Sequence, residues 1–182
     1  MLGLGNPGPE YDDTRHNVGW WALDRMAVDW DLGPFERVGK CLVAEGRVAR
    51  HPVRLVKPQT YMNRSGQVLG EVLGSIDPHT HLMVVVDDVY LDAGRLRLRG
   101  RGGAGGHKGL ESIEGALGTN AYARLRIGVG PKPASGGLSD WVLAPLEPED
   151  EAKVIDRLPD VVEGVRLWMD RGLDAAMNRI NA

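Results

Sequence analysis

Short β-rich segments alternate with segments of helical periodicity along this chain, and this alternation is the feature that most restricts its fold. The stretch 82–86 is apolar and β-branched, as in a buried central strand, whereas Trp20, Leu23 and Ala27 recur at helical spacing. Strands interleaved with helices are typical of a sheet covered by helices, so we expect an α/β fold, a single-domain mixed β-sheet sandwiched between helices. The expected strands are 41–49, 52–56, 82–86, 95–99 and 124–129, and the expected helices are 17–30, 65–73 and most of the chain from 147 onward.

Length and composition favour one globular domain over residues 1–182. The chain is 42% hydrophobic and 26% charged, which is ordinary for a globular protein of 182 residues. Cys41 is the single cysteine and cannot form an internal disulfide, and no secretory leader opens the chain. The longest apolar stretch, 82–86, is far shorter than the about 20 residues that span a bilayer. We therefore expect a cytoplasmic protein that does not enter a membrane.

Positive charge is concentrated in one part of an otherwise acidic chain. The net charge is −3, but segment 95–126 alone carries a net charge of +5. Its alternating stretch 95–99 places three arginines on one face of a strand and two leucines on the other. A local basic patch on an acidic protein suits a confined phosphate contact better than a long nucleic-acid groove.

Loops rich in glycine and proline separate the expected elements, and two of them resemble nucleotide-binding motifs. Gly3-Leu-Gly-Asn-Pro-Gly8 matches G-x-G-x-x-G, but hardly any strand precedes it and no helix is expected before about Asn17. The segment 102–109 lacks the Gly-Lys-Ser/Thr ending of a P-loop. Neither is therefore interpreted as a nucleotide site. A third loop, 131–137, is long enough to act as a lid.

The polar residues that remain in or beside these loops form the candidate site. They are Asn6, His16, Asn17, Asn63, Asp87, Asp88 and His107. A histidine can take a proton near neutral pH, and a carboxylate on its other ring nitrogen fixes the tautomer and supports the imidazolium. His16 with Asp87 or Asp88 could therefore activate a water molecule. The amides of Asn6 and Asn63 could bind a carbonyl or its oxyanion.

Five motifs in order resemble those of the bacterial peptidyl-tRNA hydrolase family, and the resemblance covers nearly the whole chain. They are Gly3-Leu-Gly-Asn-Pro-Gly-Pro-Glu-Tyr11 with Thr14-Arg-His-Asn17, Lys57-Pro-Gln-Thr-Tyr-Met-Asn63 with Ser65-Gly66, Asp87-Asp88, Gly105-Gly-His-Lys-Gly-Leu110, and Arg124-Leu-Arg-Ile-Gly128. The resemblance implies a monomeric α/β enzyme, without metal or cofactor, that cleaves the ester joining a peptide to the 3′ ribose of tRNA. Such an enzyme recycles tRNA from abandoned translation.

The resemblance also implies a role for each matching residue. His16 would be the general base on water, and Asp88 the group that holds its basic form. Asn6 would sense the blocked amine of the peptide, and Asn63 would bind near the scissile carbonyl. The remaining contacts would be Tyr11 and Tyr61 with the terminal end of the tRNA, and Arg99 and Arg126 with its 5′ phosphate.

The sequence departs from the family pattern at two places. Lys108 stands where the family's glycine-rich loop usually has asparagine, which changes one substrate contact. The first strand has fewer apolar residues before Gly3 than is usual, so either the start is misassigned or trimmed, or this edge of the sheet is weakened. Two alternatives to an enzyme are a catalytically idle RNA-binding protein and a generic α/β domain with satisfied polar loops.

Overall fold

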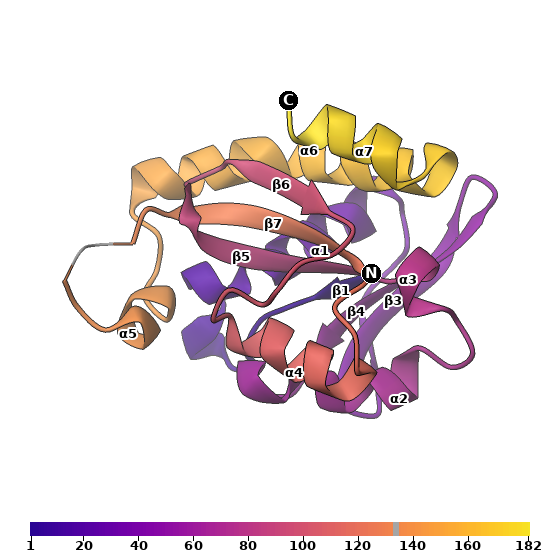
Figure 1. Ribbon diagram of the computed structural model, residues 1–182, viewed down its shortest axis with the longest axis horizontal. Helices are drawn as coiled ribbons and strands as arrows, with labels where there is room; N and C mark the ends of the chain where they lie inside the picture. Colours follow the sequence, from indigo (N-terminus) through magenta and orange to yellow (C-terminus); the bar gives the residue numbers. More distant parts are fainter. Residues whose placement is uncertain (133–134) are drawn as a thin grey trace.

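A seven-stranded mixed sheet forms the centre of the molecule, with the order β2-β3-β4-β1-β5-β7-β6 (Figure 1). The computed structural model describes residues 1–132 and 135–182. The inner strands β4, β1, β5 and β7 are parallel, whereas the pairs β2/β3, β3/β4 and β6/β7 are antiparallel. The strands are β1 (Leu2–Gly3), β2 (Glu36–Val38), β3 (Cys41–Val48), β4 (His51–Pro58), β5 (Met83–Asp92), β6 (Leu96–Arg99) and β7 (Ala123–Gly130).

Helices cover both faces of this sheet, which confirms the expected α/β sandwich (Figure 1). On one face, α1 (Val18–Asp29), α6 (Pro148–Arg171) and α7 (Leu173–Ile180) share a core with Met83 and Val85 of β5. On the other, η3 (Met62–Val68), α2 (Leu69–Val72) and α4 (Lys108–Leu117) pack with Val84 and Val86. The short elements η1 (Pro9–Tyr11), η2 (Arg15–Asn17), α3 (Pro78–His81) and α5 (Leu138–Val142) complete the described fold.

Three glycines let α1 lie against the centre of the sheet. A Cβ on Gly3 would lie 2.7 Å from the carbonyl oxygen of Gly19, and one on Gly5 would lie 2.8 Å from the ring of Trp20. A Cβ on Gly19 would lie 2.6 Å from the carbonyl oxygens of Leu4 and Val85. The glycines that resemble a nucleotide-binding motif therefore serve close packing here. That packing brings η2, just before α1, to the edge of β5.

The structure corrects two expectations about individual elements. Residues 65–68 belong to the 3₁₀ segment η3 and residues 69–72 to the short helix α2; in η3, Ser65 Oγ donates to the carbonyl of Met62 and the Gly66 amide donates to Ser112 Oγ. These local bonds compete with a regular α-helix. The short first strand β1 lies between β4 and β5, in the middle of the sheet and not at an edge. The loop expected at 131–137 includes residues 133 and 134, which lie outside the described residues.

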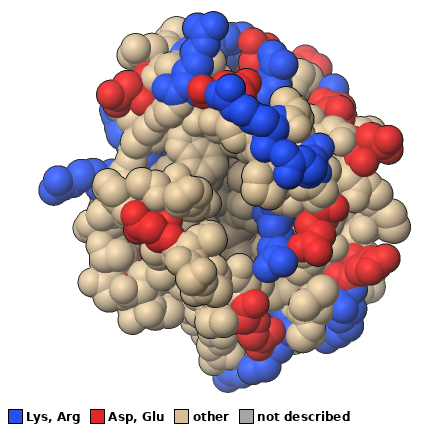
Figure 2. All heavy atoms as spheres, turned by 90° about the vertical axis from the view of Figure 1, so that its right-hand side faces the viewer, with Lys and Arg blue, Asp and Glu red and all other residues tan. Residues whose placement is uncertain are grey.

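The amino ends of the parallel strands form one face of the molecule. It contains a groove between β4, α3 and the end of α6, lined by charged residues such as Arg54 and Glu45 and by apolar ones such as Trp168. Figure 2 shows this face, hollowed at its centre, with basic and acidic side chains intermixed. Among the described residues, no helix is long and apolar enough to cross a membrane.

Candidate active site

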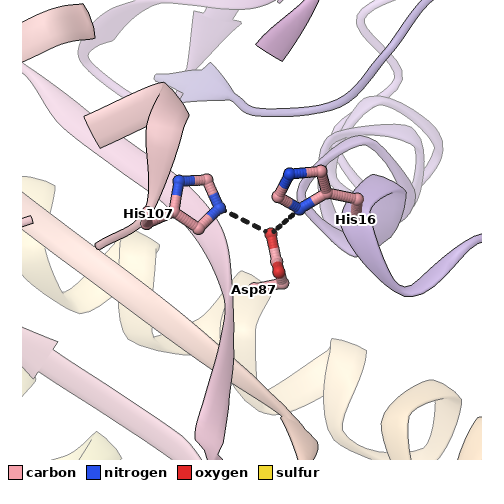
Figure 3. A group of neighbouring side chains, drawn as sticks. All are labelled: His16, Asp87 and His107. Atoms are coloured by element: carbon pink, nitrogen blue, oxygen red, sulfur yellow. Dashed lines mark hydrogen bonds and ion pairs between the residues drawn. The ribbon is translucent and has the colours of Figure 1, made fainter. Parts of the chain in front are cut away.

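Three side chains from separate parts of the chain, two of them buried and that of His107 partly buried, meet at the carboxyl end of the sheet. His16 lies in η2, Asp87 in β5, and His107 immediately before α4 (Figure 3). His16 Nδ1 is 2.9 Å from Asp87 Oδ1, and His107 Nε2 is 2.8 Å from the same oxygen. Because the carboxylate only accepts, both ring nitrogens donate to it. In neutral His16 the proton therefore sits on Nδ1, and Nε2 is left as a base.

Asp87 holds His16, and the expectation that Asp88 does so is wrong. Asp88 Oδ2 instead accepts a bond from Nη1 of Arg126 at 3.1 Å, and Asp88 Oδ1 accepts the amide of Tyr90 at 2.9 Å. The reason is the alternation of side chains along β5. Asp87 falls on the face of the sheet that α1 covers, next to η2, whereas Asp88 falls on the opposite face with the side chain of Arg126.

His16 and Asp87 shift each other's pKa. Burial acts to lower the pKa of His16, but the charge of Asp87 and the bond to it outweigh burial and raise the pKa above its ordinary value. Burial acts to raise the pKa of Asp87, but His16 and His107 together hold it well below its usual range. Asp87 is therefore a carboxylate at neutral pH, and its charge favours the protonated form of His16.

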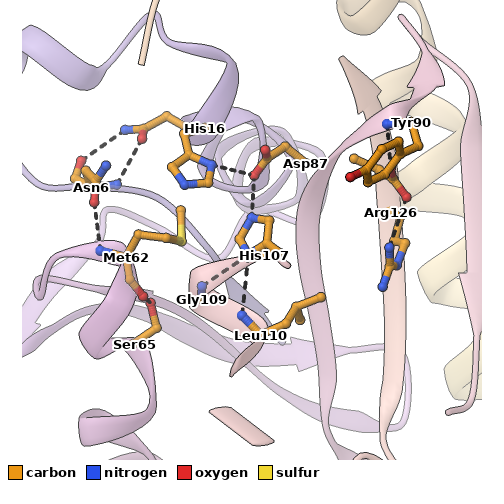
Figure 4. A network of polar contacts seen from close by, with 12 residues as sticks. Asn6, His16, Met62, Ser65, Asp87, Tyr90, His107, Gly109, Leu110 and Arg126 are labelled. Carbon is orange, nitrogen blue, oxygen red and sulfur yellow. Dashed lines mark hydrogen bonds and ion pairs between the residues drawn. The ribbon is translucent and has the colours of Figure 1, made fainter. Parts of the chain in front are cut away.

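Asn6 lies beside His16 and Asp87 and is fixed there by hydrogen bonds to η3 and η2 (Figure 4). Its side-chain oxygen accepts the amide of Met62 at 2.8 Å, and its backbone exchanges two bonds with the side chain of Asn17, at 2.9 and 3.0 Å. The Nδ2 group of Asn6 has no hydrogen-bond partner among the described residues, so it remains a donor. Asn63 follows Met62 in η3 and is exposed. No hydrogen bond joins Asn63 to His16 in the structure.

A cavity of about 270 Å³ opens beside His16 and is lined by residues from β5, α4, β7 and α5, among them Asp87, His107, Lys108, Arg126 and Val142. Two aromatic residues expected in substrate binding lie outside this lining. Tyr11 is half-buried at the end of η1, and Tyr61 is exposed just before η3.

The basic patch expected from 95–126 is real but smaller than the sequence indicates. Arg97 pairs with Arg126 and Arg99 with Arg124 across β6 and β7, so the four share one face of the sheet. Arg124 is buried, stacks on Tyr122, and bonds to Glu114 and to the carbonyls of Gly103 and Asn120. It is a structural residue. Arg99 is exposed, and Arg126 keeps an exposed edge while binding Asp88 and the Gly103 carbonyl.

Lys108 is the first residue of α4 and lies at the rim of the cavity. Its ammonium donates to Glu111 at 2.9 Å, and the side chain is mostly exposed. An exposed pair of this kind contributes little to stability, so Lys108 can leave Glu111 for a ligand.

The group His16, Asp87 and His107 also has the composition of a metal site, since its ligand atoms lie within 4.8 Å of one another. The hydrogen bonds do not fit that use. His107 Nδ1 accepts the amides of Gly109 and Leu110 at 3.1 and 3.4 Å, so the proton of the neutral ring is on Nε2. That proton faces Asp87, and Nε2 has no lone pair to offer a metal.

The contact between His107 and Asp87 is the part of the site that the sequence analysis missed. His107 was among the candidates, but with no partner assigned. The available indication was its position between a glycine-rich loop and a helix, where a side chain can cap the helix and face the sheet edge.

Together the fold and the site define a class, an α/β protein in which a histidine oriented by a carboxylate can activate water for hydrolysis. A family model described as peptidyl-tRNA hydrolase matches residues 1–182. The chain therefore belongs to the peptidyl-tRNA hydrolase family.

Relatives and solved structures agree with this assignment. A peptidyl-tRNA hydrolase of Symbiobacterium thermophilum is 45% identical, over 100% of this chain and 97% of that protein. One of Gemmatimonas aurantiaca is 42% identical, over 98% of this chain and 96% of that protein. A crystal structure of the peptidyl-tRNA hydrolase of Acinetobacter baumannii superposes with a TM-score of 0.93 at 34% identity, covering 100% of this chain and 93% of that one.

Proposed function

We propose that this protein hydrolyses the ester bond between peptide and tRNA in peptidyl-tRNA, releasing free tRNA and peptide after abandoned translation. The observation that carries the proposal is the bond between His16 Nδ1 and Asp87, which leaves His16 Nε2 as a base beside an open cavity. Membership of the peptidyl-tRNA hydrolase family names the substrate.

The reaction follows from the donors and acceptors of the site. His16 Nε2 removes a proton from a water molecule as its oxygen attacks the ester carbonyl carbon, and the imidazolium that forms is stabilised by Asp87. The bond from that carbon to the 3′ ribose oxygen then breaks, and His16 returns the proton to the ribose oxygen. Donors such as Asn6 Nδ2 and the amide of Asn63 would stabilise the carbonyl oxygen or hold the peptide backbone.

Substrate binding is assigned to groups around the cavity. Tyr11 and Tyr61 would contact the terminal nucleotides, because exposed aromatic rings stack on unpaired bases. Arg99 and Arg126 would bind the 5′ phosphate with charge-assisted bonds, and Lys108 would contact the acceptor end. We further propose that residues 1–182 act as one domain, as a monomer, in the cytoplasm where translation supplies the substrate.

The test is to incubate the protein with peptidyl-tRNA and separate the free tRNA. We expect release by the wild type and a loss of at least about 100-fold in kcat for His16→Ala, the usual contribution of a positioned base. His79→Ala, which removes an exposed histidine in α3, is the matched control and should retain activity. Binding of tRNA without release would instead identify an RNA-binding protein.

A further inference from the structure

The first turn of α4 fixes the orientation of His107 and the position of its proton. Its Nδ1 accepts the amides of Gly109 and Leu110, which α4 itself leaves without partners. A proton on Nδ1 would point at these two donors and at the positive end of the helix. The ring is therefore held as the Nε2–H tautomer, aimed at Asp87.

The backbone around His107 is built for this orientation. Gly105 and Gly106 have φ values of +63° and +81°, which residues other than glycine rarely adopt. They lie in the turn that leads to His107 and the start of α4. A Cβ on Gly109 would lie 2.6 Å from the sulfur of Met62 and 3.1 Å from Cε1 of His107. The ring is thus confined between the helix start and β5.

Asp87 Oδ1 is shared by the two histidines. It accepts His16 Nδ1 at 2.9 Å and His107 Nε2 at 2.8 Å, whereas Asp87 Oδ2 is buried without a hydrogen-bond partner among the described residues. Each donor reduces the negative charge that the oxygen presents to the other. The hold of Asp87 on the proton of His16 is therefore weaker than that of a carboxylate bonded to His16 alone.

We propose that His107 is a positioning residue, held by α4 in its Nε2–H form, that shares Asp87 Oδ1 with His16. By doing so it keeps His16 basic down to a lower pH than if Asp87 were bonded to His16 alone. This proposal rests on the proposed role of His16 as the general base. It assigns His107 no contact with the substrate.

Other charged groups around the site are already engaged and stay unchanged in the variants below. On β5 and β7, Asp88 is paired with Arg126, and on α4, Lys108 is paired with Glu111. Arg15, next to His16, bonds to the carbonyls of Ala144 and Pro145. Among the further titratable or charged side chains of these elements, Tyr90 and Asp92 on β5 and Asp140 on α5 are exposed, and Glu114 on α4 is paired with Arg124 on β7.

Two substitutions separate the two bonding roles of His107, the capping of α4 by its Nδ1 and the bond from its Nε2 to Asp87. In His107→Asn, the amide oxygen can replace Nδ1 as the cap of α4, but the side chain is too short to reach Asp87. In His107→Gln, the amide nitrogen can reach Asp87 from the place of Nε2, but the cap is lost. The measurement is the acid limb of kcat/KM against pH, which reports the protonation of the free enzyme.

We expect the acid limb of His107→Asn to move upward by about half a pH unit or more, and that of His107→Gln to return toward the wild type. An unmoved limb in His107→Asn, or an equal shift in both variants, overturns the proposal. A merely structural role would lower kcat in both without moving the limb, and thermal unfolding of both variants shows whether they fold.

Nitrogen NMR of the unaltered protein tests the same proposal without hydrolysis. We expect His107 to show a protonated Nε2 and an unprotonated Nδ1 where the enzyme is active. A proton on His107 Nδ1 there contradicts the proposal even if the hydrolase activity is confirmed. Conversely, full activity of His16→Ala would overturn the mechanism of the proposed function while the NMR result stands.

Discussion

Arg126 binds Asp88 across the neighbouring strands β7 and β5, with 3.1 Å between Nη1 and Oδ2, and this pair leaves Asp87 as the carboxylate that serves His16. Adjacent residues of one strand thus have different tasks. Asp87 faces the histidines in a buried position, whereas Asp88 faces the basic patch.

Substitution of each aspartate should separate these tasks. Asp87→Asn should lower kcat at least about 100-fold, because an amide no longer supports the imidazolium of His16. Asp88→Asn should change KM more than kcat, lowering KM by about threefold, because Arg126 then meets the substrate without a competing carboxylate. Steady-state kinetics measures both effects. A larger kcat loss in Asp88→Asn than in Asp87→Asn would contradict the assignment.

The pH dependence of activity should follow His16. Since the net effect of its surroundings raises the pKa of His16, kcat/KM should fall as the pH drops through a midpoint above about 6.5. In Asp87→Asn, the residual activity should have its acid limb at lower pH, because the charge that raises this pKa is gone. A limb at the same pH in both proteins would mean that another group titrates.

Stability should depend on pH through the same pair. A raised pKa of His16 in the folded state stabilises the fold below about pH 6.5 and loses this contribution as the pH rises through the folded-state pKa. The depressed pKa of Asp87 stabilises the fold above about pH 3.9 and loses its contribution as the pH falls further. Thermal unfolding should show His16→Ala losing more stability at about pH 5.5 than at about pH 8, on the two sides of the reference histidine pKa of about 6.5.

Arg99 and Arg126 should bind phosphate and not read bases. Arg99→Ala and Arg126→Ala should weaken different peptidyl-tRNAs alike and should reduce the salt dependence of binding. Removal of the substrate's 5′ phosphate should then weaken substrate binding by the wild type more than binding by these variants. Arg37→Ala, at the opposite edge of the sheet, is the charge-matched control. An equal loss of substrate binding in all of these proteins would exclude the two arginines as phosphate ligands.

Lys108 should tolerate replacement by the family's asparagine. Its ammonium only donates, whereas an amide both donates and accepts, so Lys108→Asn should keep or raise kcat. The salt slope of tRNA binding should become slightly smaller with one charge fewer near the RNA. Loss of most activity in this variant would show that Lys108 is itself essential for the reaction.

The close packing of α1 should be sensitive to a single methyl group. Gly19→Ala should lower the free energy of unfolding by about 1–3 kcal/mol, because the new Cβ meets the carbonyls of Leu4 and Val85. Gly115→Ala in α4 is the control, since a Cβ there would meet no neighbouring atom within 4 Å and alanine favours a helix. Urea unfolding compares the two, and equal stability would refute the packing role of Gly19.

Local pattern alone determined much of this fold. The apolar stretch 82–86, the helical spacing around Trp20 and the alternation of 95–99 each lie in the expected element, as β5, α1 and β6. These patterns are visible because an element that buries one face repeats its apolar residues with its own period. The same holds for the candidate residues, since polar side chains in glycine-rich loops have no core to fill.

Tertiary structure decided which of those residues meet. Neighbouring aspartates are equivalent in a list of motifs, but strand pleating sends Asp87 toward η2 and Asp88 toward Arg126. Arg124 and Arg126 likewise look alike in sequence, yet Arg124 is buried and structural. Such choices depend on which layer covers each face of the sheet, and that is set by long-range packing, including the close approach of Gly19 in α1 to Gly3 and Leu4. His16 and His107 can both donate to Asp87 Oδ1 only because this packing brings η2, β5 and the start of α4 together.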